Sequence, residues 1–271
     1  MNETDAHTHD DPVWREALSG HARTRVWMRR LFRILSPGAS RRCHLCLAPF
    51  DGTAAPIMRA IGRGPWRRNP HFCEQCERFF REHRGGAEVE IAVLYADVRG
   101  STPMAARMRP AEFGAMMQRF YSVATGALTE RDAAIDKMVG DEVIGIFLRG
   151  LIGDDYRKKA VRAGLDLLRA TGHADATGPW LPLGIGVHSG ITFVGSVSTE
   201  SGAYEFAALG ETMNLGARLV SSAGTGELVL SDAVWPDVAA ELDAKERTLN
   251  LKGIDGPVRA HVARLDYANK A

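Results

Sequence analysis

The sequence predicts an α+β sandwich preceded by a small metal-binding module. Residues 85–267 alternate between stretches with the two-residue period of strands and stretches with the 3.6-residue period of helices. All four cysteines lie within residues 41–84. Of the 271 residues, 45% are hydrophobic and 25% are charged, so a disordered or collagen-like chain is excluded.

Residues 1–22 are polar and rich in acidic side chains, and we expect them to form a disordered tail. They lack the apolar core and cleavage site of a secretory signal. No apolar run in the chain approaches the roughly 18 residues of a membrane-spanning helix. We therefore expect a cytoplasmic protein.

Residues 23–36 predict a basic amphipathic helix that ends before Pro37-Gly38. Its arginines lie opposite an apolar face formed by Val26, Trp27, Leu31, Ile34 and Leu35. Such a helix can lie peripherally on an anionic membrane through residues 23–35, or pack against a dimer mate or the next module. The short apolar face favours packing. Residues 15–84 carry 15 arginines and 5 acidic residues, but a solvated basic surface explains this charge, and no nucleic-acid partner is expected.

The cysteines form two C-x₂-C pairs, Cys43 with Cys46 and Cys73 with Cys76, separated by 26 residues. Two such pairs can supply a tetrahedral thiolate site, which favours structural zinc over an iron–sulfur cluster. Four cysteines can also form disulfides or stay as free thiols, although a cytosolic setting disfavours disulfides. A module of this size has a small core, so the metal would supply much of its stability.

The body of the chain opens with a strand over Glu88–Asp97, whose apolar side chains alternate. A helix is expected over Pro110–Glu130, because apolar residues recur there at helical spacing. Residues Ala134–Leu148 predict a hairpin turning at Gly140-Asp141, since a leading glycine suits a type II′ turn. The remaining elements are a helix over residues 156–171, two strands (Leu183–Val187 and Ile191–Val197) turning at Ser189-Gly190, a helix over Asn214–Ser222 and a strand over Glu227–Leu230.

Three short segments carry groups that suit chemistry at phosphorus. Asp97 ends a strand before a loop with a glycine, where a carboxylate can hold a hard cation and backbone N–H groups can meet phosphate. Lys137 and Asp141 lie on the predicted hairpin, and Asn214 and Arg218 share one helix face. Each pattern alone is common, but their order along the chain is specific.

Four motifs resemble the catalytic domain of the class III nucleotide cyclases, the adenylate and guanylate cyclases. They are LYADVRGST (94–102), DKMVGDEVIGIF (136–147), LGIGVHSGITFVGSV (183–197) and ALGETMNLGARL (208–219). The resemblance implies a ferredoxin-like βαββαβ sandwich over residues 85–267. It also implies conversion of ATP to 3′,5′-cyclic AMP and pyrophosphate at a homodimer interface.

The resemblance also implies roles for individual residues. Asp97 and Asp141 match the aspartates that hold two Mg²⁺ or Mn²⁺ ions, and Lys137 matches the purine-selecting lysine of adenylate cyclases. Asn214 and Arg218 match the ribose-orienting and transition-state residues. The loop that would line the triphosphate comprises Val98, Gly100, Ser101 and Thr102. In the family's head-to-tail dimer, the two aspartates of one subunit face the lysine, asparagine and arginine of the other.

One position departs from the family pattern. A second purine-contacting residue, commonly Asp or Thr, should fall at Ala207, and alanine has no polar group to read a base edge. This departure leaves guanylate or dual-specificity cyclase activity as a second hypothesis. A third hypothesis is a catalytically silent, nucleotide-binding regulator, which the filled metal and transition-state positions disfavour.

Overall fold

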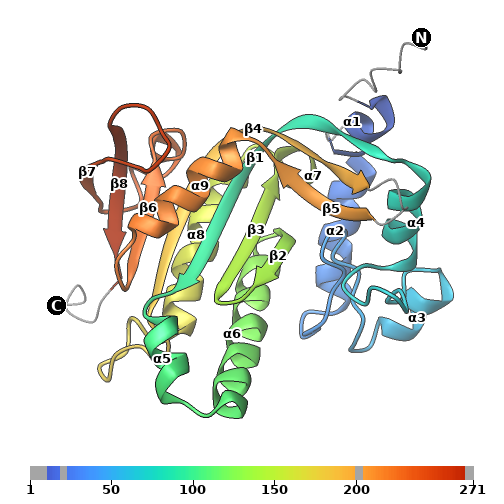
Figure 1. Cartoon of the computed structure of the whole chain (residues 1–271). Helices are drawn as coiled ribbons and strands as arrows, with labels where there is room; N and C mark the ends of the chain where they lie inside the picture. Colours follow the sequence, from blue (N-terminus) through green and yellow to red (C-terminus); the bar gives the residue numbers. More distant parts are fainter. Residues whose placement is uncertain (1–10, 19–22, 199–203, 266–271) are drawn as a thin grey trace, which may run out of the picture.

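The computed structural model describes residues 11–18, 23–198 and 204–265. One large sheet organises the body, in the order β2-β3-β1-β4-β6-β8-β7, with β5 paired to β4 (Figure 1). All described strand pairs are antiparallel except β4 with β6. The strands are β1 (Gly85–Val98), β2 (Ala134–Val139), β3 (Glu142–Leu148), β4 (Leu183–Ser198), β5 (Tyr204–Leu209), β6 (Glu227–Ser231), β7 (Lys245–Leu249) and β8 (Val258–Arg264).

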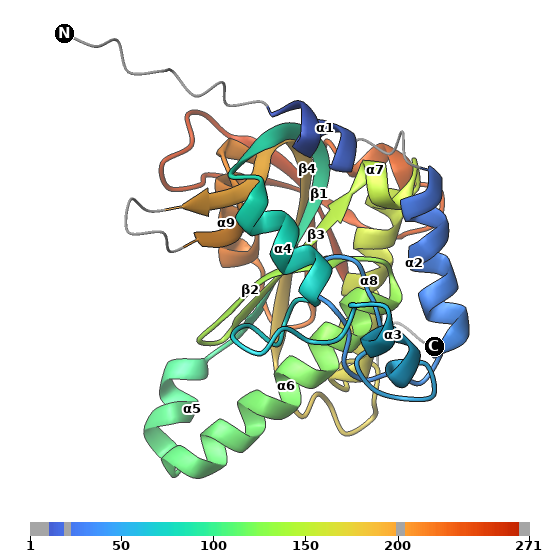
Figure 2. The same cartoon turned by 90° about the vertical axis from the view of Figure 1, so that its right-hand side faces the viewer.

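The helices lie on both faces of this sheet, so the α+β class is confirmed with an additional layer. Alternate β1 residues such as Leu94 share a buried core with α6 and α8 on one face. Their neighbours, including Val93 and Tyr95, face α9 and the four-cysteine segment of residues 41–84, the cysteine module. Figures 1 and 2 show how these elements are arranged around the sheet. The helices are α1 (Pro12–Leu18), α2 (Arg23–Leu35), α3 (Ala55–Ala60), α4 (Glu74–Glu82), α5 (Ser101–Arg107), α6 (Pro110–Glu130), α7 (Arg149–Ile152), α8 (Tyr156–Ala170) and α9 (Glu211–Ser222).

The expected helix at Pro110–Glu130 and the hairpin at Ala134–Leu148 are both confirmed. Gly140 leads the two-residue turn with a φ of 60°, while Asp141 keeps a negative φ, as a type II′ turn requires.

The predicted turn at Ser189-Gly190 is wrong, because β4 runs without interruption through this point. The Ser189 hydroxyl donates to the Ile91 carbonyl at 2.8 Å, and Gly190 pairs with Ile91 across the sheet. A Cβ at Gly190 would lie 2.6 Å from the Thr212 hydroxyl oxygen. The glycine therefore permits the close approach of α9 to the sheet.

The front of the chain differs from the disordered tail expected over residues 1–22. Within it, Pro12–Leu18 forms α1, whose Trp14 is fully buried. The Trp14 indole donates to the His83 carbonyl at 3.0 Å and stacks on Phe80 at a centroid distance of 5.9 Å. One large aromatic side chain thus anchors a polar segment. Apart from residue 11, the rest of that segment lies outside the described residues.

Helix α2 forms where the amphipathic pattern predicts it, but it turns a different face inward. Trp27 and Ile34, expected on the packed face, are 63% and 75% exposed, whereas Arg29 and Phe32 are 3% exposed. The buried Arg29 guanidinium donates to the Leu45 carbonyl at 2.6 Å. Hydrogen bonding to backbone carbonyls offsets the cost of burying this charge.

Candidate active site

Asp97 and Asp141 lie together at one end of the sheet. Asp97 is the penultimate residue of β1 and is paired in register with Glu142 at the start of β3. The Val98 N–H donates to the Asp141 carbonyl at 3.1 Å, which fixes the hairpin turn beside the end of β1. Alternation along β1 places Asp97 on the face of Val93 and Tyr95.

Arg99 and Ser101 hold the two carboxylates from the loop that follows β1. The Arg99 guanidinium forms an ion pair with Asp97, and the Ser101 hydroxyl donates to Asp141. Arg99 also donates to the Val220 and Ala223 carbonyls at the C-terminal end of α9, at 3.4 and 3.3 Å. The loop therefore ties the metal-binding candidates to the last turn of α9.

Each aspartate also keeps one carboxylate oxygen without a hydrogen-bond partner among the described residues. Paired carboxylate oxygens are the donor type that Mg²⁺ and Mn²⁺ prefer. The Asp97 side chain is 25% exposed, so a cation can reach it. Burial and the neighbouring Asp141 raise the pKa of Glu142, which lies at the same corner.

Lys137 lies on β2 and lines a cavity of about 310 Å³ between the sheet and the cysteine module. Its ammonium is 3.3 Å from a Glu205 carboxylate oxygen on β5 and 3.6 Å from Asp136. The Asp136 side chain is 2% exposed, and one of its oxygens has no partner among the described residues. Burial raises the pKa of Asp136 to about 6.

Asn214 and Arg218 are four residues apart on α9, and both are exposed. Their side chains make no hydrogen bond or ion pair to other described parts of the chain. The opposite face of α9 packs closely on the sheet, where a Cβ at Gly216 would lie 2.7 Å from the Tyr95 ring. This packing holds α9 against the sheet, while the Asn214 amide and the Arg218 guanidinium point away from the sheet.

Within the described residues, the site is therefore in two parts. The structure brings Asp97 and Asp141 together, along with the loop Val98, Gly100, Ser101 and Thr102. No direct contact joins either aspartate to Lys137, Asn214 or Arg218. The sequence interpretation missed Arg99, Asp136 and Glu205. Arg99 and Asp136 lie inside the quoted motifs, next to residues that were assigned a role. No motif in the sequence around Glu205 pointed to that residue.

The four cysteines form a second site. Their sulfur atoms lie within 4.8 Å of one another, and the Cys46 and Cys73 sulfurs are 3.6 Å apart. A disulfide would need about 2.05 Å, whereas the sulfurs of a tetrahedral zinc site lie roughly 3.8 Å apart, given Zn–S bonds of about 2.3 Å. Cys43 and Cys73 are buried, and Cys46 and Cys76 are partly exposed.

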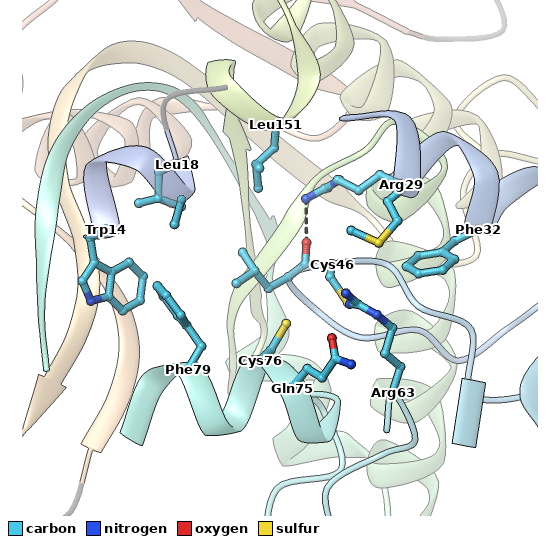
Figure 3. Close-up of a pocket in the computed structure, with 13 residues that line it drawn as sticks. Trp14, Leu18, Arg29, Phe32, Cys46, Arg63, Gln75, Cys76, Phe79 and Leu151 are labelled. Atoms are coloured by element: carbon cyan, nitrogen blue, oxygen red, sulfur yellow. Dashed lines mark hydrogen bonds between the residues drawn. The ribbon is translucent and has the colours of Figure 1, made fainter. Parts of the chain in front are cut away.

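An apolar cavity of about 200 Å³ borders this thiol cluster (Figure 3). Cys46 and Cys76 line it together with the aromatic rings of α1, α2 and α4. Arg63 donates to the Cys46 sulfur at 3.5 Å, and Arg29 lines the same cavity. Four thiolates around a divalent cation carry a net charge of −2, which these two guanidinium groups would balance.

The chain folds as an α+β sandwich, and the paired carboxylates at the end of β1 are donors of the type that divalent cations prefer. A family model for the adenylate and guanylate cyclase catalytic domain matches residues 86–259. The chain belongs to this family, and the resemblance found in its motifs is confirmed.

Curated relatives include two uncharacterized proteins of Mycobacterium tuberculosis. They are 29% and 27% identical to this chain over 188 and 187 residues, which is 66% of the chain in each case. The matched region is 33% and 32% of their own length, so the chain spans about a third of each.

Solved structures of cyclases share the fold. The guanylyl cyclase Cya2 superposes with a TM-score of 0.60 at 23% identity, over 66% of this chain and 93% of that one. The adenylyl cyclase CyaB from P. aeruginosa gives a TM-score of 0.58 at 20% identity, over 66% and 95%. Both substrate classes thus occur among the neighbours. Among the described residues, no helix is both long and apolar enough to cross a membrane.

Proposed function

We propose that the protein is an adenylate cyclase, which converts ATP to 3′,5′-cyclic AMP and pyrophosphate in intracellular signalling. The observation that carries the choice of ATP is Lys137, a hydrogen-bond donor on the wall of a cavity lined by aromatic rings. An ammonium group can donate to the ring nitrogen of adenine, and aromatic rings suit the flat faces of a base.

Asp97 and Asp141 are the residues that would hold two Mg²⁺ or Mn²⁺ ions, and their free oxygens fit such ions. When bound, these ions supply positive charge that favours ionisation of the ribose 3′-hydroxyl and stabilises the leaving pyrophosphate. Arg99 and Ser101 orient the two carboxylates through the contacts described above. The backbone of Val98, Gly100, Ser101 and Thr102 would bind the triphosphate.

The chain's own contribution to the reaction is positioning and charge stabilisation. Asn214 would orient the ribose so that its 3′-oxygen faces the α-phosphorus. The bond from that oxygen to phosphorus forms as the bond to pyrophosphate breaks, and the hydroxyl proton passes to water. Arg218 would neutralise charge on the phosphoryl oxygens in the transition state, since its planar guanidinium matches phosphate.

We further propose that the complete site forms between two copies of the chain. The aspartates at the end of β1 make no contact with Lys137, Asn214 or Arg218 within the described residues of one chain. Asn214 and Arg218 point outward from α9, which supports a role for them in the site of a second copy of the chain. A head-to-tail homodimer would unite the aspartates of one copy with the lysine, amide and guanidinium of the other.

The test is product formation by the purified chain with Mg²⁺ or Mn²⁺ and each nucleotide. Cyclic AMP alone supports the proposal. Lys137→Glu should weaken the use of ATP more than that of GTP, and equal loss on both would contradict base reading by Lys137. Folded dimers that form no product from either nucleotide would indicate a silent regulator.

A dual-specificity cyclase is the second candidate, and Ala207 favours it. This side chain is 5% exposed and offers no polar atom to a base, so Lys137 lacks the expected help at that position. Formation of both cyclic nucleotides at comparable kcat/KM by the unmodified chain would establish this second candidate.

For the cysteine cluster we propose a structural zinc ion. The sulfur spacing and the two adjacent arginines support a closed tetrathiolate centre. One zinc per chain and a colourless protein are expected. A brown protein with iron and sulfide absorbance would replace zinc by an iron–sulfur cluster.

A further inference from the structure

Helix α2 turns large apolar side chains away from the body of the protein. It packs inward through Arg29 and Phe32, which are both buried, while Trp27 and Ile34 stay largely exposed. Trp27 and Ile34 are seven residues apart in the helix, so they lie on one face, two turns from each other. The packing that the short apolar face favoured therefore occurs through another face, and the apolar stripe is left uncovered by the described parts of the chain.

The start of α3 lies beside the end of α2 and adds further exposed apolar side chains. The Ala54 N–H donates to the Ser36 hydroxyl at 3.3 Å, which joins the two helix ends. Ten large hydrophobic side chains are exposed among the described residues, and five of them belong to these two helices or directly follow α3. Such a concentration is typical of an interaction site. These five residues are named the α2–α3 surface: Trp27, Ile34, Leu35, Ile57 and Ile61.

The sequence around the α2–α3 surface carries positive charge with almost no negative charge. Between Glu16 and Glu74 the chain holds 11 arginines and a single acidic residue, Asp51. Arg30 on α2 and Arg59 on α3 are exposed and form no ion pair with other described residues. Exposed apolar side chains and unpaired guanidinium groups thus occur on the same two helices.

This combination fits the surface of a bilayer that contains anionic lipids. Apolar side chains can enter the boundary between headgroups and acyl chains, where a tryptophan ring is favoured, while arginines contact the lipid phosphates. A second copy of the chain would bring the same positive charge against this surface, which disfavours self-association. A nucleic acid would bind the arginines but would leave the aliphatic side chains in water.

We propose that the α2–α3 surface binds the protein peripherally to membranes that contain anionic lipids. Figures 1 and 2 show α2 and α3 on the opposite side of the molecule from α5, the helix that follows the loop after Asp97. Attachment through α2 and α3 therefore leaves the end of the sheet that carries Asp97 and Asp141 uncovered. The membrane contact is a property of the front of the chain and does not depend on the proposed reaction.

The test is cosedimentation of the full chain with vesicles, made either of phosphatidylcholine alone or with about a third phosphatidylglycerol. The unmodified chain should bind the anionic vesicles at least tenfold more strongly, because each arginine near such a surface contributes roughly fivefold. Added salt should weaken this binding. Brominated lipid should quench part of the tryptophan fluorescence, and Trp27→Phe should remove most of that quenching.

The variant that combines Trp27→Ser with Ile34→Ser should bind the anionic vesicles at least tenfold more weakly, because less apolar area leaves water on binding. The matched control combines Ile191→Ser with Leu209→Ser, two exposed apolar residues of β4 and β5 outside the α2–α3 surface, and should keep full binding. All four positions are exposed, so the variants should fold, and circular dichroism checks this.

Arg30→Gln should weaken binding to the anionic vesicles about fivefold, because one guanidinium near the lipid phosphates is lost. Arg107→Gln is its matched control, since Arg107 is an exposed arginine on α5, and it should bind as the unmodified chain does. Equal losses in the two variants would indicate attraction by the net charge of the whole chain and would overturn the assignment to α2 and α3.

Absence of vesicle binding, equal binding to neutral and anionic vesicles, or full binding by the Trp27→Ser and Ile34→Ser variant would each overturn the inference. Binding to a DNA duplex in place of vesicles would assign the surface to nucleic acid instead. If vesicles are not bound and light scattering shows that the same variant dissociates a dimer, the surface joins two copies of the chain and the lipid assignment is wrong. These measurements use no nucleotide, so their outcome is separate from that of the activity assays.

Discussion

Activity recovered from two inactive variants would reveal a site shared between copies of the chain. Asp97→Ala removes a carboxylate from the metal-binding half, and Arg218→Ala removes the guanidinium from the half on α9. Each variant alone should be inactive. In a mixture, a heterodimer would combine an intact Asp97 from one copy with an intact Arg218 from the other, and its second site would carry both substitutions.

The expected magnitude follows from this geometry. Random exchange of subunits makes about half of the dimers mixed, and each mixed dimer has one intact site of two, so about a quarter of the unmodified activity should return. Asp97→Ala mixed with Asp141→Ala is the matched control. The Val98 N–H bond to Asp141 places both aspartates in the same half, so no heterodimer regains an intact site.

The assay measures cyclic AMP after the variants are co-refolded or incubated together, and differently tagged chains show by co-purification that heterodimers form. Absence of recovery despite demonstrated heterodimers would refute the shared site. Equal recovery in the Asp97 and Asp141 mixture would refute the assignment of these residues to one half.

Three other predictions concern stability and packing. Gly186→Ala should lower both stability and activity, because the added Cβ would lie 2.4 Å from a backbone nitrogen of α9. The control is Gly114→Ala in α6, where the added Cβ meets open space, and it should be neutral or stabilising by up to ~1 kcal/mol. Denaturant unfolding measures both. The unmodified chain should lose up to ~3 kcal/mol of folding stability as the pH rises from about 4 to about 6, because the raised pKa of Asp136 lets the folded chain keep a proton that the unfolded chain has released. Asp136→Asn should abolish this pH dependence, as unfolding measured across that pH range can show. A variant that keeps the unmodified pH profile would contradict the prediction. Phe80→Ala should destabilise the folded chain by roughly 3–5 kcal/mol in urea melts, because the Phe80 ring is fully buried between Trp14 and Phe206. The control Ile57→Ala should change stability little, because Ile57 is 60% exposed. Similar losses for both variants would argue against this packing.

The elements that the sequence predicted well are those with a strong period or a defining turn. The helix at Pro110–Glu130 repeats its apolar residues over more than five turns, and the hairpin carries a glycine at its turn. The turn at Ser189-Gly190 failed because a glycine inside a strand can equally serve close approach by another element. Local sequence does not distinguish these uses, since the approaching Thr212 is distant in the chain.

The structure brings Asp97 and Asp141 together, and likewise the four cysteines, which the sequence singled out by residue type and motif. The burial of Arg29 was not predicted, because an arginine is ordinarily placed on the solvent side of an amphipathic helix. Glu205 was also missed, because its significance depends on a neighbour, Lys137, that is remote in sequence. Such relations between remote residues exist only once the chain has folded.

The contact between His44 and β2 has a consequence for handling the protein. The Ile135 N–H donates to the His44 carbonyl at 2.9 Å, so the first cysteine knuckle shields part of an outer strand. An uncovered outer strand can pair with strands of other molecules. Preparations stripped of their metal or oxidised at the thiols should therefore self-associate and precipitate before the catalytic body unfolds.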